Sequence, residues 1–291
     1  MSLEQFGIIL GFAGALCNAL NYAFSKDCVE KYGLHGVRQL IVVHVTFLIL
    51  MSPPLFLMGL YKEFTLQVLI DTFYIIVPYI LSQYLLIRLL AATDSSVVSP
   101  LLTLKIPVVA AMGFMVSGQI FNPQQLFAIA MIIILGFYFS SLSGKIKLMP
   151  LITMICICTG YALADYMTVR FMHNYPGTTL EKTMACICWQ YIIGGLIALP
   201  MMMSPRFKLK AMHLWYGKLP SLSWLAGTFC WVGCFYFAGV VEGNIIQSLR
   251  CVIGVLIAYI FYRKYIKDPN TFKKKLTVAF LMFTAVFIFY I

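Results

Sequence analysis

Charged side chains are scarce in this sequence of 291 residues, at 11%, and acidic ones are the scarcest, with 10 Asp and Glu against 21 Lys and Arg. A soluble globular domain carries about 25% charged residues and is about 45–50% apolar. This chain is 62% hydrophobic and has a mean hydropathy of +0.91. The composition therefore excludes an ordinary soluble domain and predicts a multi-pass integral membrane protein.

The signatures of several functional classes are also missing. No group of His, Cys, Asp and Glu has metal-ligand spacing, and C-x-C pairs such as Cys156/Cys158 point about 200° apart on a helix. Neither a nucleophile elbow nor a phosphate-cradling glycine loop occurs. The net charge of +11 lies almost wholly in short connections, which leaves no basic face for nucleic acid. We expect no enzyme, cofactor, metal or nucleic-acid partner; the expected partners are the bilayer and a small-molecule substrate, with a homodimer left open.

Long apolar runs dominate what is present. They are about 17–25 residues long, the length that crosses a bilayer as a helix, and short breaks rich in Pro, Gly, Ser and Asn separate them. The N-terminus has no basic region or small-residue cleavage site, so we expect the first span to be retained. The predicted fold is all-α, a polytopic membrane protein whose ten transmembrane helices lie at residues 6–25, 36–58, 68–90, 95–117, 124–143, 148–169, 183–203, 221–241, 244–262 and 273–291.

The chain also repeats itself once. Asn21-Tyr22 returns 144 residues later as Asp165-Tyr166, and further weak pairs share nearly the same offset: Lys26/Arg170, Gly33/Gly177, Arg38/Lys182, Asp94/Glu242 and Ile120–Pro123/Ile266–Pro269. Five spans in each half is an odd number, so the second half must be inverted in the membrane. We predict one five-helix repeat over residues 1–145 and a second over 146–291, a common transporter plan with its site near the midplane.

This architecture resembles the drug/metabolite transporter superfamily. The small-polar run Ser95-Ser96-Val97-Val98-Ser99-Pro100-Leu101, after the end of the third span at Tyr84–Ala92, is similar to that family's junction between spans three and four. Two positions depart from the usual pattern: Gln119 replaces an acidic residue, and Lys105 replaces an apolar one. The resemblance implies a central cavity between the halves and alternating access. It selects no substrate, because members carry amino acids, nucleotide sugars, sugar phosphates and other metabolites.

Two intramembrane cations are the first candidate site residues. Lys105 lies near mid-depth of the fourth span, between Pro100 and Pro107, which loosen the helix. A charge there costs about 2.5–3.5 kcal/mol, so such residues normally face a bundle interior or an aqueous cavity. Arg250 in the ninth span follows Gln247 by three residues, and a guanidinium fits carboxylate or phosphate with two parallel bonds. We predict that Lys105 and Arg250 bind the negative group of a substrate.

Polar residues in other spans complete the predicted site. Asn18 and Asn21 continue a helical face of glycines in the first span, and either line the cavity or join helices. Tyr84 and Arg88 lie four apart in the third span, where Arg88 either binds substrate or extends to the interface. Tyr161 shares a face with a lone carboxylate of the sixth span, Asp165.

Three interpretations of Asp165 stay open. It couples transport to protons, it is a static partner of Arg88 or Lys105, or it lies too near the membrane surface to matter. His44 in the second span is either a hydrogen-bonded interior group or a proton relay. The aromatic residues Trp189, Trp231, Tyr191 and Tyr236 either line a cavity or serve in packing and interfacial belts.

Because cations outnumber carboxylates inside the spans, we expect an anionic or zwitterionic solute, of the amino acid or organic acid type. The functional hypothesis is a secondary active transporter working by alternating access in the cell membrane. Two alternatives stay open: an exchanger for phosphorylated or nucleotide-type solutes, and a non-transporting membrane subunit of a lipid- or glycan-modifying complex. The connections after spans one, five, seven and nine hold most cations, which favours termini outside the cell. The relatives commonly have cytoplasmic termini, so the orientation stays open.

Overall fold

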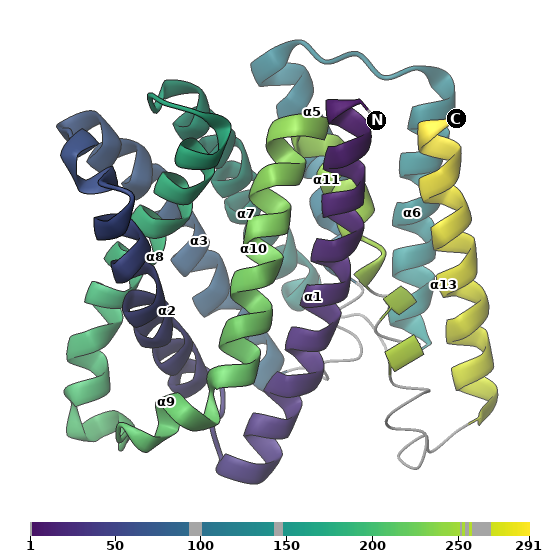
Figure 1. Ribbon diagram of the computed structural model, residues 1–291. Coiled ribbons are helices and arrows are strands. Elements are labelled where there is room, and N and C mark those ends of the chain that lie inside the picture. The colour runs from purple at the N-terminus through teal and green to yellow at the C-terminus, as the bar shows by residue number, and fades with distance from the viewer. Residues whose placement is uncertain (1, 93–100, 143–147, 251, 254–255, 258–268) are drawn as a thin grey trace.

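The computed structural model describes residues 2–92, 101–142, 148–250, 252–253, 256–257 and 269–291, and no strand occurs among them. Its long helices stand side by side in one bundle, with both termini at the same end (Figure 1). The helices are α1 (Leu3–Tyr32), α2 (Val37–Leu57), α3 (Leu66–Ala92), α5 (Lys105–Ser117), α6 (Pro123–Ser141), α7 (Leu148–Asn174), α8 (Thr179–Met203), α9 (Met212–Tyr216), α10 (Lys218–Ala238), α11 (Val240–Gln247) and α13 (Pro269–Tyr290). Short 3-10 turns are η1 (Leu60–Glu63), η2 (Leu102–Leu104) and η3 (Pro205–Phe207).

Seven of these helices are long and apolar enough to cross a membrane: α1, α2, α3, α6, α7, α8 and α10. The protein is therefore an all-helical, multi-pass membrane protein. The count of ten spans stays a prediction. The fourth and ninth predicted spans are described only in part, as η2 with α5 and as α11 with residues 252–253 and 256–257, and α13, the tenth, is not among these seven helices. Several residues named above lie outside the described ones: Asp94, Ser95–Pro100 and Ile266–Asp268.

Turn and capping residues set most helix ends. Asn122 and Thr178 form capping boxes at the starts of α6 and α8, and Gly33 ends α1 in the left-handed conformation with φ 62°. α1 extends beyond the predicted residues 6–25 at both ends, and α8 begins four residues before the predicted residue 183. Hydropathy underestimates the length of such helices, because their polar ends remain helical beyond the apolar layer of the membrane.

One predicted boundary is wrong in an informative way. The break between the eighth and ninth spans was expected after residue 241, but α10 ends at Ala238 and Gly239 turns the chain with φ 104°. Glu242 consequently lies in the first turn of α11 and not in a connection, and its Oε1 accepts a 2.7 Å hydrogen bond from Nε2 of Gln119. The amide at Gln119 is thus a partner of the carboxylate in the other half.

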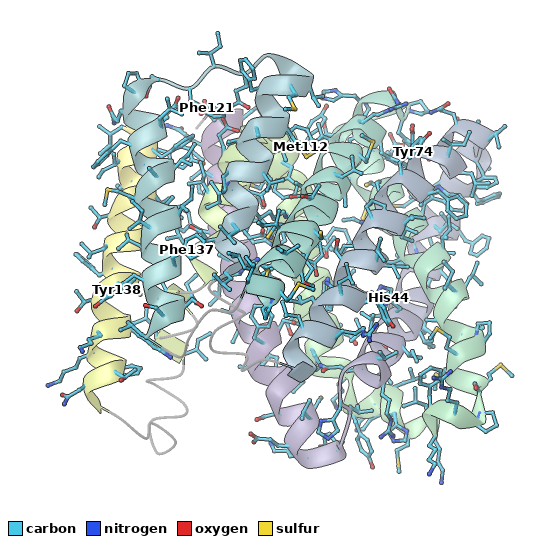
Figure 2. All side chains as sticks on the ribbon, turned by 180° about the vertical axis from the view of Figure 1, so that it is seen from behind. His44, Tyr74, Met112, Phe121, Phe137 and Tyr138 are labelled. Carbon is cyan, nitrogen blue, oxygen red and sulfur yellow. The ribbon has the colours of Figure 1, made fainter. Side chains whose placement is uncertain are left out.

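The long helices pack in pairs: α1 along α10, α2 along α8, α3 along α7, and α6 along α13. Glycine permits the closest approaches; a Cβ on Gly14 of α1 would lie only 2.8 Å from Cε2 of Trp231 on α10. His44 lies inside the bundle with 4% of its surface exposed, whereas Tyr138 lies at the outer edge of α6 and is 49% exposed (Figure 2). Exposed apolar side chains of this kind suit a lipid environment.

Candidate functional site

A cavity of about 200 Å³ lies between the helices and takes its lining from both halves of the chain. Polar and aromatic groups from α1, α3, α7, α8 and α10 face it, together with the start of α5, the last residue of α11 and Arg250 beyond it. Its polar and aromatic lining residues are Asn18, Asn21, Tyr22, Tyr79, Gln83, Lys105, Tyr161, Asp165, Thr168, Gln190, Tyr191, Trp224, Thr228, Trp231, Phe235, Gln247 and Arg250.

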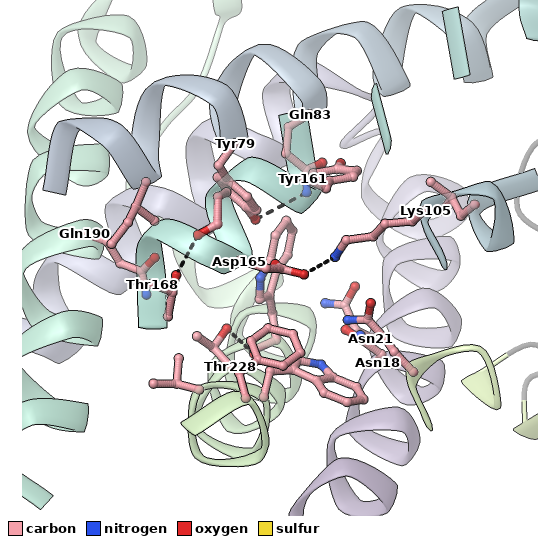
Figure 3. A pocket seen from close by; sticks show the side chains of 18 of the residues that line it. Asn18, Asn21, Tyr79, Gln83, Lys105, Tyr161, Asp165, Thr168, Gln190 and Thr228 are labelled. Carbon is pink, nitrogen blue, oxygen red and sulfur yellow. Dashed lines mark hydrogen bonds and ion pairs between the residues drawn. The ribbon is translucent and has the colours of Figure 1, made fainter. Parts of the chain in front are cut away.

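A buried ion pair stands at this cavity. The ammonium Nζ of Lys105 lies 2.6 Å from Oδ2 of Asp165, and the two side chains are only 9% and 16% exposed. The same Oδ2 accepts a 2.7 Å hydrogen bond from Nδ2 of Asn244 on α11, while the ring of Tyr161 has its centroid 5.7 Å from the ammonium. Figure 3 shows Lys105 reaching across to Asp165, with Asn18 and Asn21 beside the pair.

The local sequence places Lys105 at a helix start. The chain forms the 3-10 turn η2 and becomes α-helical at Lys105, so the expected continuous helix through this residue is interrupted. Pro107 falls in the first turn of α5, where its missing N–H costs nothing because first-turn donors have no intrahelical acceptor. Lys105 therefore lies where the 3-10 turn passes into the α-helix, and its side chain lines the cavity.

The inward face of α3 differs from the predicted one. Ile75, Tyr79, Gln83 and Leu86 line the cavity at spacings of four, four and three, and Gln83 donates a hydrogen bond to the hydroxyl of Tyr79. Tyr84 and Arg88 are not among the lining residues: both are exposed, and the guanidinium of Arg88 lies 5.7 Å from the Tyr84 ring centroid. The i, i+4 spacing was recognised correctly, but a shift of one residue rotates a side chain by about 100°.

The polar stripe of α1 serves both purposes that its sequence left open. Its glycine end packs against α10, and its amide end reaches the cavity at Asn18 and Asn21. Asn21 also joins helices, because its Nδ2 donates a 2.7 Å hydrogen bond to the carbonyl oxygen of Pro220. Asn18 has the freer position of the two for contact with a solute.

Several lining residues were missed in the sequence. These are Tyr79, Gln190, Trp224 and Thr228, uncharged residues of apolar helices that no sequence motif marks. Only Tyr79 had a signal, because it lies four residues before Gln83 and therefore on the same face of α3. The hydroxyls of Tyr191 and Thr228 are hydrogen-bonded to each other across α8 and α10. Four aromatic residues are expected from the sequence either to line a cavity or to serve in packing; of these Tyr191 and Trp231 line the cavity, and Trp189 and Tyr236 do not.

His44 is placed apart from the cavity lining. Its Nδ1 lies 2.9 Å from the carbonyl oxygen of Leu40, one turn back on α2, and its ring packs among Phe47, Tyr79 and Trp224. The backbone contact and the aromatic cage are those of a packed interior histidine.

The charges of the site are unequal. Lys105 and Arg250 are the cations of the described lining, and Asp165 is its carboxylate. Amides and hydroxyls supply further donors and acceptors, and aromatic rings form much of the wall. This arrangement can hold a small polar solute by charge and hydrogen bonds.

Comparisons with known proteins bear on the family and the fold of the chain. Residues 5–142 match the EamA-like transporter family. No curated protein matches the chain. A solved structure, described only as the crystal structure of a protein, is similar over 98% of this chain and 97% of its own, with a TM-score of 0.65 and 12% identity. At that identity the likeness concerns the fold alone.

Proposed function

We propose that this chain is a secondary active transporter of a small anionic or zwitterionic metabolite, because residues 5–142 match the EamA-like transporter family, which is consistent with the expected drug/metabolite transporter superfamily. The solute would bind in the cavity and cross by alternating access. Lys105 and Arg250 would bind its negative group, and Asn18, Asn21, Tyr161 and Gln247 would shape the site.

The observation that carries the proposal is the ion pair of Lys105 and Asp165 at the cavity. Taking two charges out of water costs several kcal/mol per ion, which their attraction alone does not reliably return. A purely structural pair at this depth could be replaced by apolar residues at little cost. Placement beside a cavity with a second cation in its lining supports a role in binding or in charge compensation.

Helix packing supports two inverted repeats as the framework. In chain order, α1, α2, α3, α5 and α6 of the first half correspond to α7, α8, α10, α11 and α13 of the second. Because α7 corresponds to α1 and α10 to α3, the packing of α7 on α3 is the counterpart of the packing of α1 on α10. The other two pairs, α2 with α8 and α6 with α13, each join a helix to its own counterpart. Lys105 and Arg250 are 145 residues apart, close to the 144 between Asn21 and Asp165. The cavity would thus lie at the seam of the repeats, where transporter sites occur.

Cavity size favours the smaller of the solute classes considered. Sites for drug-sized ligands are about 300–1,000 Å³, and a cavity of about 150 Å³ holds a molecule such as benzene. The volume of about 200 Å³ therefore suits an amino acid or organic acid better than a nucleotide. An exchanger of small solutes remains a second candidate, and transport insensitive to a pH gradient but accelerated by internal solute would favour it. A non-transporting subunit would have no need of a cavity lined by both halves.

Transport in proteoliposomes tests the proposal. Amino acids and small organic acids are screened for uptake by the purified protein, and Lys105→Ala and Arg250→Ala are then compared with the wild type. We expect each substitution to reduce uptake at least tenfold, because each removes a charge that would bind the solute. Arg88→Ala is the matched control, since Arg88 is exposed and lies outside the lining. Full uptake by both cavity variants would overturn the site assignment, and loss in the control alone would do the same.

The role of Asp165 is tested in the same vesicles. If Asp165 carries the coupling proton, Asp165→Asn should abolish accumulation driven by a pH gradient yet retain exchange of labelled for unlabelled solute. If it only balances the charge of Lys105, the variant should impair both processes together.

A further inference from the structure

The second candidate binding region lies at the opposite end of the bundle from the termini, in the connection between α8 and α10. This connection, residues 204–217, contains η3 and α9. Both flanking helices are candidate membrane spans, so a link of this length is held at the membrane boundary. Figure 1 shows α9 at the lower end, with the N- and C-termini at the upper end.

The connection has an inner and an outer face. Leu209, Leu214 and Tyr216 pack inward against a small core of Cys28, Leu34 and Val42. Two further contacts fix it in place. The ring of Tyr216 stacks on Tyr32 of α1 with centroids 4.1 Å apart, and the Sγ of Cys28 donates a hydrogen bond to its carbonyl oxygen. The segment is thus anchored to α1 and α2 along its inner face.

The outer face presents cations beside large apolar groups. Arg206, Lys208 and Lys210 are exposed, and Met212 and Trp215 show 59% and 66% of their surface. The Nζ of Lys218 lies 3.2 Å from the ring centroid of Trp215. The sequence from 182 to 241 holds no acidic residue, so these cations have no counter-charge within their own stretch of chain.

We propose that this outer face, formed by Arg206, Lys208, Lys210 and Trp215, binds the headgroups of anionic phospholipids. Cations next to a membrane are attracted to anionic lipid, and tryptophan favours the headgroup layer. The exposed apolar side chains distinguish a lipid from a free phosphate ion, because they would be buried in the acyl boundary when the lipid is bound. The site is separate from the cavity and does not depend on transport.

Native mass spectrometry of the purified full chain tests the site, with phosphatidylglycerol and phosphatidylcholine of equal chain length as probes. We expect preferential retention of phosphatidylglycerol. A single cation near an anionic surface changes affinity about fivefold, so R206Q/K210Q should lose an order of magnitude or more in retention. K273Q/K274Q, which removes two exposed lysines at the start of α13, is the matched control and should lose much less. W215A should weaken retention of the lipid while leaving the charge unchanged.

Three results would overturn the proposal. Equal retention of the two lipids by the wild type removes the preference for anions. Equal loss in the two double variants shows that overall charge, and not this face, attracts the lipid. Displacement of the lipid by inorganic phosphate at the same concentration shows an anion site without a contribution from the lipid's apolar part. Thermal unfolding of each variant in detergent without added lipid confirms that it is folded.

Discussion

At the scale of single residues, the ion pair of Lys105 and Asp165 lowers the free-energy cost of holding each charge in an apolar environment. Their 2.6 Å separation keeps both charges in a place where either alone would be costly. Asn244 adds a donor to the same carboxylate oxygen. A second buried carboxylate, Asp71 on α3, is held in the same manner by Gln67, Asn174 and the half-exposed Arg170. Asp165 is thus supplied with two such partners and Asp71 with three.

This arrangement predicts strong energetic coupling between Lys105 and Asp165. Lys105→Met alone leaves a largely buried carboxylate without its cation, and Asp165→Asn alone leaves a largely buried ammonium without its anion. Each should lower the unfolding free energy by about 3–5 kcal/mol. The double variant should lose clearly less than the sum of the two. Unfolding of the purified protein in detergent provides the measurement.

An exposed pair on α1 is the matched control for that cycle. Lys31 and Asp27 lie 3.1 Å apart with 63% and 32% of their side chains exposed. Lys31→Met and Asp27→Asn should couple by no more than about 0.5 kcal/mol, because water screens them. Additive losses at the cavity pair would contradict the assigned interaction.

At the scale of elements, helix pairs depend on small residues at their crossings. A Cβ on Gly195 of α8 would lie 2.4 Å from Cβ of Leu48 and 2.8 Å from the carbonyl oxygen of His44, both on α2. A Cβ on Gly227 of α10 would meet Cβ of Cys17 at 3.4 Å, an ordinary contact with α1. The α2–α8 pair is thus the tighter of the two at these positions.

Alanine substitution at the two glycines should therefore have opposite effects. Gly195→Ala pushes α8 from the backbone of α2 and should lower stability by about 1–3 kcal/mol, the usual cost of overpacking. Gly227→Ala should be neutral or stabilising by up to about 1 kcal/mol, because alanine is the better helix former. Melting temperatures in detergent compare them, and equal loss in both would contradict the packing described for α2 and α8.

At the scale of the whole molecule, charge is divided between the two ends of the bundle. The end with α9 carries Arg206, Lys208 and Lys210, and the termini lie at the other end (Figure 1). Since cytoplasmic connections collect Lys and Arg, this division supports the α9 end in the cytoplasm and the termini outside.

Cysteine labelling from one side of the membrane tests that orientation. In a background without the exposed Cys156, a membrane-impermeant thiol reagent added to intact cells should label Glu63→Cys, near the start of α3. It should label Ala211→Cys, next to α9, only after the cells are opened. The reverse pattern would place the termini in the cytoplasm, against the charge rule.

The sequence by itself determined the class of protein and which charged residues lie within its membrane spans. Apolar runs too long and too poor in charge for a soluble domain predict membrane helices, and a lysine within such a run predicts an interior site, because lipid cannot solvate it. The family resemblance followed from the number and order of these runs, and the match over residues 5–142 confirmed it.

Only the tertiary structure decided which of those groups meet. Tyr84 and Arg88 showed the right spacing on the wrong face, because hydropathy does not fix the rotation of a helix that is apolar all round. The choice among partners for Asp165 depended on contacts between helices far apart in the chain, and Lys105 and Asn244 now supply them. The outer face of residues 204–217 likewise required the fold, since only packing shows which of its side chains turn away from the bundle.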